Sequence, residues 1–328
     1  MKKLSSMILI LSMMLIIGCK RVKPELDIVQ QSSWLVYWDD ERGIEELQNI
    51  PDLFQELSIF ALDFNEKGEF RNQQAVSNMI AQVEETQNTM HLFVTIVNDV
   101  VTEKQSIQKD QNILQTILID HPEKYITEIV QKCVELGVSG IELDFERIPR
   151  EMMPEYLSFI EQLSTELNKK NKMLKVVLEP SLVTDAYQYP SIARYIIMAY
   201  NLYGTHSEPG PKANTEFLND LCETAKNLPG DVAIALATGG FQWSDSKVRG
   251  ITELEGKQMI SSFALQPHRD ELSQALSASF QDSLGEVSIW YGDAQTMQYW
   301  KSIVVSYGYD VAYFRLGGND IKTLQSLK

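Results

Sequence analysis

The chain is poor in the residues that build disulfide scaffolds and metal centres. Its 328 residues include only three cysteines and four scattered histidines. Three cysteines are too few for a fold held by disulfides, and isolated histidines lack the close spacing typical of zinc sites. Cys133 and Cys222 lie in helix-like stretches, where we expect them to be small buried residues rather than metal ligands.

Basic residues are also scarce. Lysine and arginine together number 29 against 45 acidic residues, so the formal net charge is −16. This balance excludes the basic surface of a nucleic-acid-binding protein and disfavours direct electrostatic attachment to anionic lipid. With 44% apolar and 23% charged residues the chain can bury a full core. Nothing in the sequence indicates an obligate partner, so we expect a monomer with no nucleic-acid partner.

The N-terminus lacks an apolar run long enough to span a bilayer. Lys2 and Lys3 precede an apolar segment of eleven residues, 7–17, interrupted only by Ser12; a spanning helix needs about 20 residues. This is the pattern of an export signal. The sequence Leu-Ile-Ile-Gly-Cys at 15–19 resembles the lipobox of bacterial lipoproteins. The resemblance implies removal of 1–18, lipidation of Cys19, and an extracytoplasmic protein anchored to a bacterial membrane. Plain cleavage near the same point is the alternative.

Residues 19–32 are polar and without pattern, so we interpret them as a tether. From residue 33 to 328, short β-rich apolar runs alternate with helical periodicity, which is typical of parallel βα units. The eight expected strands are Trp34–Trp38, Glu56–Phe64, Met90–Val97, Gly140–Phe145, Leu174–Leu178, Tyr195–Tyr200, Val232–Thr238 and Val311–Leu316. Eight such strands predict an α/β fold of the (β/α)8 or TIM-barrel type.

Two segments between these strands carry more specific predictions. The clearest helix spans about 121–136, with Asp120 as its expected cap and Gly137 as its end. Residues 244–293, between the seventh and eighth strands, form a small expected insertion on the barrel rim. We expect helices at 251–263 and 270–276 of the insertion, and strands around Ser279 and at 287–291.

The most informative segment is Gly140-Ile141-Glu142-Leu143-Asp144-Phe145-Glu146. Apolar and acidic residues alternate strictly, so on a strand the three carboxylates share one face. In a barrel whose strands are buried on both sides, that face is the barrel interior, and its carboxyl end is the active-site mouth. Mutual repulsion should raise at least one carboxyl pKa, and the outermost acid, Glu146, is the natural general acid.

Two other interpretations of these acids remain open. On a half-exposed strand, solvent would simply hydrate the carboxylates. Alternatively, Glu142 and Asp144 could hold a divalent cation such as Mg²⁺ or Ca²⁺, because both ions prefer oxygen ligands.

Residues 139–146 resemble the fourth-strand signature Asp-Gly-x-Asp-x-Asp-x-Glu of glycoside hydrolase family 18, the chitinase-like barrels. The resemblance makes Glu146 the proton donor and Asp144 the residue that orients the substrate acetamido group. Ser139 and Glu142 stand where the family usually has Asp. Glu142 would then replace the buried acid that supports Asp144.

Further motifs follow in the family's order. Met198-Ala199-Tyr200-Asn201 resembles its Met-x-Tyr-Asp, which makes Tyr200 a hydrogen-bond donor to the acetamido carbonyl. The segments around Trp243, Trp290 and Phe314 resemble its last strands, with Phe314 where the family usually places Trp beneath the sugar. We therefore expect six substrate-binding residues: Glu142, Met198, Asn201, Trp243, Trp290 and Phe314. The arrangement is most similar to the bacterial cell-wall and spore-cortex branch.

The resemblance implies substrate-assisted, retaining hydrolysis of β-linked N-acetylglucosamine glycan without a metal or other cofactor. The expected partner is an N-acetylated polysaccharide, peptidoglycan or chitin. Catalysis would rest on Glu146, Asp144 and Tyr200. Because Ser139, Asn201 and Phe314 depart from the family pattern, a non-catalytic glycan-binding lipoprotein is the alternative.

Overall fold

The computed structural model describes residues 29–191, 194–244, 247–283 and 285–328. The predicted signal peptide, the lipidation site Cys19 and most of the predicted tether lie outside these ranges. Within them, no helix has both the length and the apolar character needed to cross a bilayer.

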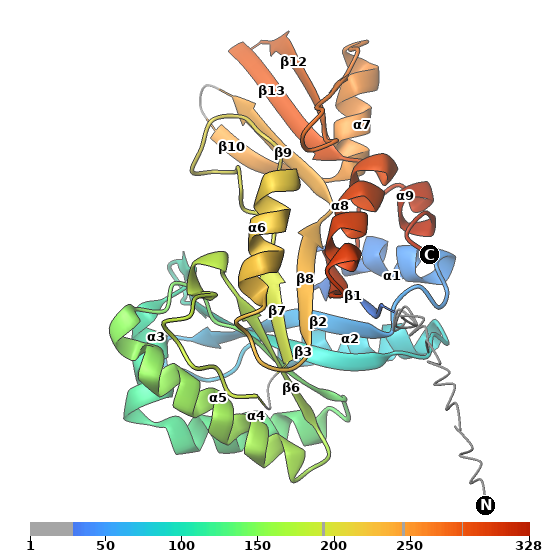
Figure 1. The fold of residues 1–328 in the computed structure, drawn as a ribbon. Helices are drawn as coiled ribbons and strands as arrows, with labels where there is room; N and C mark the ends of the chain where they lie inside the picture. Colours follow the sequence, from blue (N-terminus) through green and yellow to red (C-terminus); the bar gives the residue numbers. More distant parts are fainter. Residues whose placement is uncertain (1–28, 192–193, 245–246, 284) are drawn as a thin grey trace, which may run out of the picture.

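Eight parallel strands close into a barrel, as predicted (Figure 1). The strands are β1 (Gln31–Val36), β2 (Glu56–Asn65), β3 (His91–Val101), β5 (Gly140–Asp144), β6 (Met173–Leu178), β7 (Arg194–Met198), β8 (Val232–Ala237) and β14 (Asp310–Phe314). Every neighbouring pair is parallel, and the pairing of β2 with β3 closes the ring. Because β1 begins at Gln31, the last two residues of the predicted tether belong to the barrel.

Helices connect successive strands around the outside of the barrel (Figure 1). They are α1 (Asp40–Asn49), α2 (Gln73–Glu85), α3 (Gln111–Gln115), α4 (Pro122–Glu135), α5 (Met153–Asn168), α6 (Thr215–Ala225), α8 (Ala294–Ser306) and α9 (Ile321–Gln325), with the short turns η1 (Thr116–Asp120), η2 (Arg150–Met152) and η3 (Pro180–Leu182). A two-residue strand, β4 (Ser106–Ile107), folds back antiparallel on the end of β3.

Helix α4 confirms the predicted helix but not its predicted cap. Gly137, just beyond its end, has a φ of 70°, which glycine adopts without steric cost. Asp120 is the last residue of η1, and His121 occupies the cap position without a side-chain hydrogen bond. The helical path therefore runs almost unbroken from α3 through η1 into α4, which leaves Asp120 no cap to form.

The insertion is an antiparallel sheet that follows β8 at the carboxyl end of the barrel (Figure 1). It contains β9 (Gly239–Ser244), β10 (Lys247–Ile251), α7 (Glu253–Ser262), β11 (His268–Arg269), β12 (Leu276–Asp282) and β13 (Gly285–Gly292). The strands predicted around Ser279 and at 287–291 are confirmed as β12 and β13, but the sheet begins five residues earlier than expected, at Gly239. The helix predicted at 270–276 is wrong. Asp270 accepts hydrogen bonds from the backbone N–H and hydroxyl of Ser273, and this turn leads into β12.

Apolar side chains fill two layers. The larger layer lies between the barrel and its helices and includes Ile141, Leu143 and Phe145 of the acidic segment, as well as the buried free cysteines Cys133 and Cys222. The barrel interior holds a smaller cluster: Trp34, Val177, Ile196, Met198, Ala233, Ala235 and Ala312. Because the alanines are small, polar side chains occupy the rest of the interior.

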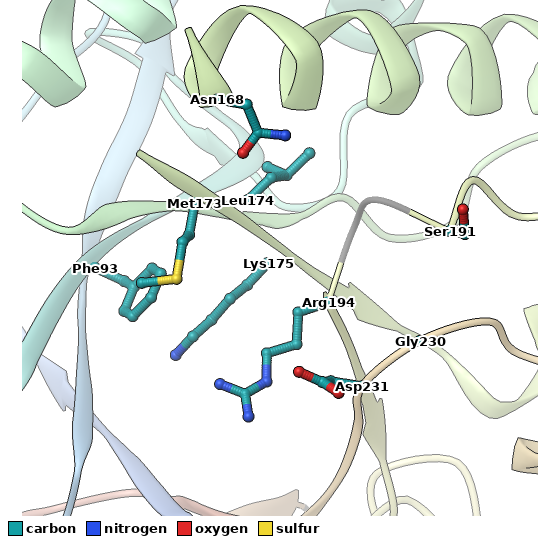
Figure 2. Close-up of a pocket in the computed structure, with 9 residues that line it drawn as sticks. All are labelled: Phe93, Asn168, Met173, Leu174, Lys175, Ser191, Arg194, Gly230 and Asp231. Atoms are coloured by element: carbon teal, nitrogen blue, oxygen red, sulfur yellow. The ribbon is translucent and has the colours of Figure 1, made fainter. Parts of the chain in front are cut away.

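An ion-pair network crosses the amino end of the barrel, beside a pocket of about 290 Å³ (Figure 2). Lys175 Nζ lies 2.7 Å from Glu56 Oε2 and over the ring of Phe93. Arg194 contacts both Glu56 and Asp310. Because Lys175 is only 1% exposed, this network places a buried positive charge behind the acidic residues of β5.

Candidate active site

The three acids of the β5 segment lie along one line from the barrel interior towards its mouth. Glu142 is fully buried, Asp144 is 8% exposed, and Glu146 stands just past the end of β5. Their apolar neighbours pack outward against the helices. The alternation prediction is confirmed, and the interpretation of the acids as hydrated surface groups is wrong for Glu142 and Asp144.

Glu142 is held by three donors inside the barrel. Its Oε1 accepts hydrogen bonds from Trp34 Nε1 at 2.5 Å and Thr95 Oγ1 at 2.7 Å. Its Oε2 accepts from Ser58 Oγ at 2.8 Å and lies 3.9 Å from Lys175 Nζ. These donors satisfy both oxygens of a carboxyl group that solvent does not reach. Glu142 is fully buried and does not line the pocket that Asp144 and Glu146 line.

Asp144 has an unused buried oxygen. Among the described residues, its Oδ1 atom has no hydrogen-bond partner. Burial raises the pKa of Asp144 well above its ordinary value, and the charges of Glu146 and Glu142 raise it further. Asp144 therefore keeps a proton at pH values where an exposed aspartate is ionised, and it retains an acceptor for an incoming N–H group.

Glu146 lies at the cleft, where its backbone and carboxylate are both held. Asn98 fixes its backbone: Asn98 Oδ1 accepts from Glu146 N–H at 2.9 Å and Asn98 Nδ2 donates to Glu146 O at 3.1 Å. Its carboxylate contacts the ammonium of Lys109, which follows β4. Burial raises the pKa of Glu146, Lys109 lowers it, and Glu179 and Asp99 raise it again; the net shift is upward. An upward shift is what a glutamic acid needs to donate a proton near neutral pH.

Aromatic rings form the base of the site. Phe314, at the end of β14, stacks on Tyr200 with centroids 5.7 Å apart and packs edge-on against Trp34. Burial raises the pKa of Tyr200 well above its ordinary value, and the charge of Asp144 adds to this. The Tyr200 hydroxyl has no hydrogen bond to the described residues, so it is a free neutral donor. Met198 is nearly buried beneath these rings and supports them.

Two adjoining lobes form a cleft at the barrel mouth and meet at Trp38. The first, of about 370 Å³, is lined by the acids Asp63, Asp99, Asp144 and Glu146 together with Lys109. Burial raises the pKa of Asp63 to about 6, against the opposing charge of Arg71. The second lobe, of about 480 Å³, lies over Phe314 beside the insertion. Trp38 lines both lobes and is 50% exposed, so a ligand along the cleft would contact its ring.

The structure separates three of the predicted substrate-binding residues from this centre. Asn201 is exposed beyond β7. Trp243 is 6% exposed in β9, where its Nε1 donates to Ser207 O at 3.1 Å. Trp290 lies in β13 and packs against the main core. The two tryptophans do not line either lobe of the cleft.

Sequence reasoning missed several residues at the mouth. Trp38, which lies within the predicted strand Trp34–Trp38, is two residues beyond the end of β1 and half exposed at the meeting point of the lobes. Lys109 and Lys212 lie in connecting loops without any motif, and only the folded chain brings them to the cleft. Glu179 accepts a hydrogen bond from Arg147 N–H at 2.8 Å.

A metal site does not emerge from the described residues. They contain no group of three or more histidine, cysteine or acidic side chains arranged to hold an ion. The oxygens of Glu142 are already engaged by Trp34, Ser58 and Thr95. Glu142 therefore has no open oxygen for the cation that the alternative places on Glu142 and Asp144.

Comparison with known proteins finds one curated glycosylase relative and solved structures of the same fold. No protein-family model matches the sequence. One curated relative, "Uncharacterized glycosylase YvbX" of Bacillus subtilis (strain 168), is 24% identical over 195 residues, which span 54% of this chain and 56% of the relative. The spore cortex-lytic enzyme SleL of Bacillus cereus superposes with a TM-score of 0.79 at 17% identity, covering 91% of this chain and 73% of that one. A chitinase from Chromobacterium violaceum gives 0.77 at 15% identity, covering 91% and 98%.

The chain shares their fold. At these identities the likeness establishes the barrel architecture and leaves the activity to be argued from the site itself.

Proposed function

We propose that this chain is a retaining glycoside hydrolase of the family 18 type that cleaves β-linked N-acetylglucosamine glycan, in peptidoglycan or a chitin-like polymer. One observation carries the proposal: Asp144 Oδ1 is buried without a hydrogen-bond partner among the described residues. The free hydroxyl of Tyr200 stands at the same base. An acetamido group satisfies both, because its N–H donates to Asp144 and its carbonyl accepts from Tyr200.

In this proposal each acid has its own role. The acetamido oxygen of the substrate attacks the anomeric carbon while Glu146 protonates the departing glycosidic oxygen, giving an oxazolinium intermediate. Water then opens this ring at the anomeric carbon, and Glu146, now a base, takes the proton from the water. No second carboxylate is needed as a nucleophile. Glu142, two residues earlier on β5, lies deeper in the barrel and supports the position of Asp144.

The test compares the wild type with Glu146→Gln on peptidoglycan strands and on N-acetylglucosamine oligomers, with products identified by mass spectrometry. Loss of general acid catalysis should lower kcat by about 10²–10⁴-fold, while the oligomers still bind. De-N-acetylated oligomers are the matched control, since the mechanism requires the acetamido group. Unchanged hydrolysis by Glu146→Gln, or equal cleavage of the de-N-acetylated oligomers, would contradict the proposal.

The contact between Lys109 and Glu146 supports a second candidate, a non-catalytic glycan-binding protein. An acid paired with an ammonium is engaged rather than poised to donate, and Phe314 offers a smaller platform than tryptophan. In that case both the wild type and Glu146→Gln are retained on the polymer and neither releases a product.

We also propose that Cys19 is lipidated and that it anchors the protein to the outer face of a bacterial membrane. Support comes from the export-signal pattern and the lipobox-like residues 15–19. Metabolic labelling with an alkyne-tagged fatty acid should mark the wild type and leave Cys19→Ser unlabelled. Labelling of both proteins would contradict the assignment.

A further inference from the structure

The two lobes of the cleft carry charges of opposite sign. Acids dominate the lobe around Glu146, whereas Arg42, Lys212 and Arg315 line the lobe over Phe314. Glu255 is the acid that lines this second lobe. In a chain with a net charge of −16, a pocket with three cationic side chains and one acidic side chain in its lining calls for an explanation.

Lys212 lies in the loop between β7 and α6, with its amine directed to the end of β8. Its Nζ donates to Thr238 O at 2.9 Å and lies 5.2 Å from the centre of the Phe241 ring. Within the described ranges no carboxylate lies within ion-pair distance of it. Burial, with the nearby charge of Arg315, lowers the pKa of Lys212 to about 7. A buried amine without a counter-ion gains from an anionic ligand.

The two arginines retain free donors. Asp39 accepts hydrogen bonds from Nε and Nη2 of Arg42 and from Nη1 of Arg315. Within the described part of the chain, Nη1 of Arg42 and both Nε and Nη2 of Arg315 have no hydrogen-bond partner. One carboxylate thus orients two guanidinium groups without using all their N–H donors.

The remaining acids around this lobe are engaged elsewhere. Glu255 accepts from Thr252 N–H at 2.7 Å and pairs with Arg249 at 3.2 Å. Glu46 is buried behind the lobe, where it accepts from the backbone N–H groups of Gly317 and Asn319. Burial raises the pKa of Glu46, and the hydrogen bonds from Gly317 and Asn319 lower it.

We propose that the lobe lined by Arg42, Lys212 and Arg315 is a carboxylate-binding subsite for a sugar that neighbours the one seated on Phe314. The inference rests on the proposed hydrolase function and extends it to the substrate class. Trp38 lines both lobes, so one glycan chain can occupy them together. Guanidinium and ammonium groups are the side chains that best recognise carboxylate oxygens. The preferred polymer is then an N-acetylated glycan bearing carboxylates, such as one containing N-acetylmuramic acid, rather than neutral poly-N-acetylglucosamine.

The test uses one polymer in two charge states. Peptide-free peptidoglycan strands carry a free carboxylate on alternate sugars, and coupling with methylamine converts these groups to neutral amides without changing the sugars. The wild type should show a kcat/KM about tenfold higher on the charged strands, the scale of one charged hydrogen bond. Lys212→Met and Arg42→Gln should each bring this ratio towards one. Lys322→Met, at an exposed position on α9, should keep it.

Arg42 lies at the surface, so Arg42→Gln is a variant that folds even if Lys212→Met does not. Equal rates of the wild type on charged and amidated strands would overturn the proposal, as would an unchanged ratio in both variants. Peptide-bearing strands, in which the sugar carboxyl is already an amide, show which carboxylate the lobe binds. If these strands bind more weakly than peptide-free strands, the lobe binds the carboxylate of the sugar. If they bind more tightly, it binds a carboxylate of the peptide.

Failure of the proposed hydrolase function and failure of the proposed subsite give different experimental results. Equilibrium dissociation constants are measured calorimetrically with Glu146→Gln, so turnover is not required. A preference of this variant for charged strands, with no cleavage by the wild type, supports the subsite and rejects the hydrolase. Cleavage by the wild type without any charge preference supports the hydrolase and rejects the subsite.

Discussion

The ammonium of Lys109 contacts the carboxylate of Glu146, the proposed proton donor. Lys109 comes from the loop after β4, and its backbone N–H donates to Asp99 Oδ1 at 2.8 Å. The hairpin that carries Lys109 is therefore anchored beside the cleft. The contact opposes the effect of burial, because the lysine charge lowers the pKa of Glu146 while desolvation raises it.

Replacing Lys109 should extend activity to higher pH. In Lys109→Met the lowering influence is lost, so the pKa of Glu146 rises and the protonated acid persists at higher pH. The alkaline limb of the pH profile of kcat/KM should move upward, by about one pH unit or less for a partly exposed pair. Lys104→Met, on the same hairpin but exposed, is the matched control and should leave the limb in place. A downward shift in Lys109→Met would show that the lysine does not stabilise the ionised acid.

Two tryptophans near the first strand should respond very differently to the same substitution. Trp34 is 3% exposed and donates to buried Glu142, whereas Trp38 is 50% exposed at the cleft. Trp34→Phe removes one donor from a buried charge and should lower the free energy of unfolding by about 1.5–3 kcal/mol. Trp38→Phe should change it by less than about 0.5 kcal/mol and weaken glycan binding instead. Urea unfolding and binding assays on both variants separate the effects. Equal loss of stability would contradict the assignment.

The architecture and the arrangement of β5 could be predicted from the sequence because both follow from local periodicity. Strict alternation at 140–146 allows only one arrangement once β5 lies inside a barrel, with Glu142 and Asp144 inward and Ile141 and Leu143 outward. The run of parallel strands likewise follows from buried apolar segments separated by helices. For both features, the local sequence pattern and the tertiary contacts favour the same structure.

The remaining features of the site depend on contacts between residues distant in sequence. Trp34 and Glu142 are 108 residues apart, and only the closed barrel brings the indole to the carboxylate. The substrate roles predicted for Trp243 and Trp290 rest on motif resemblance, and neither residue lines the cleft in the folded chain. No periodicity marks Lys109 or Lys212, since loops that follow barrel strands carry no pattern tied to burial.

The buried pair of Lys175 and Glu56 should couple strongly in a double-mutant cycle. Lys175→Met leaves Glu56 with Arg194 alone and removes the positive charge behind Glu142, so we expect it to lower the free energy of unfolding by about 3–5 kcal/mol. Glu56→Gln alone leaves the Lys175 ammonium buried without its nearest partner. The double variant should lose less stability than the sum of the single variants, because it removes both charges together.

The pH dependence of this pair follows from the carboxyl pKa. Burial raises the pKa of Glu56, but Lys175 and Arg194 lower it by more, so its value in the folded chain lies below the ordinary 4.5. The stabilisation is therefore fully present above that ordinary value and is lost as the pH falls through the folded pKa. The difference in the free energy of unfolding between the wild type and Glu56→Gln should shrink as the pH is lowered from 7 to below 4. Denaturant titrations across that range measure it, and a difference that grows towards acid pH would show that Glu56 is not held ionised by its partners.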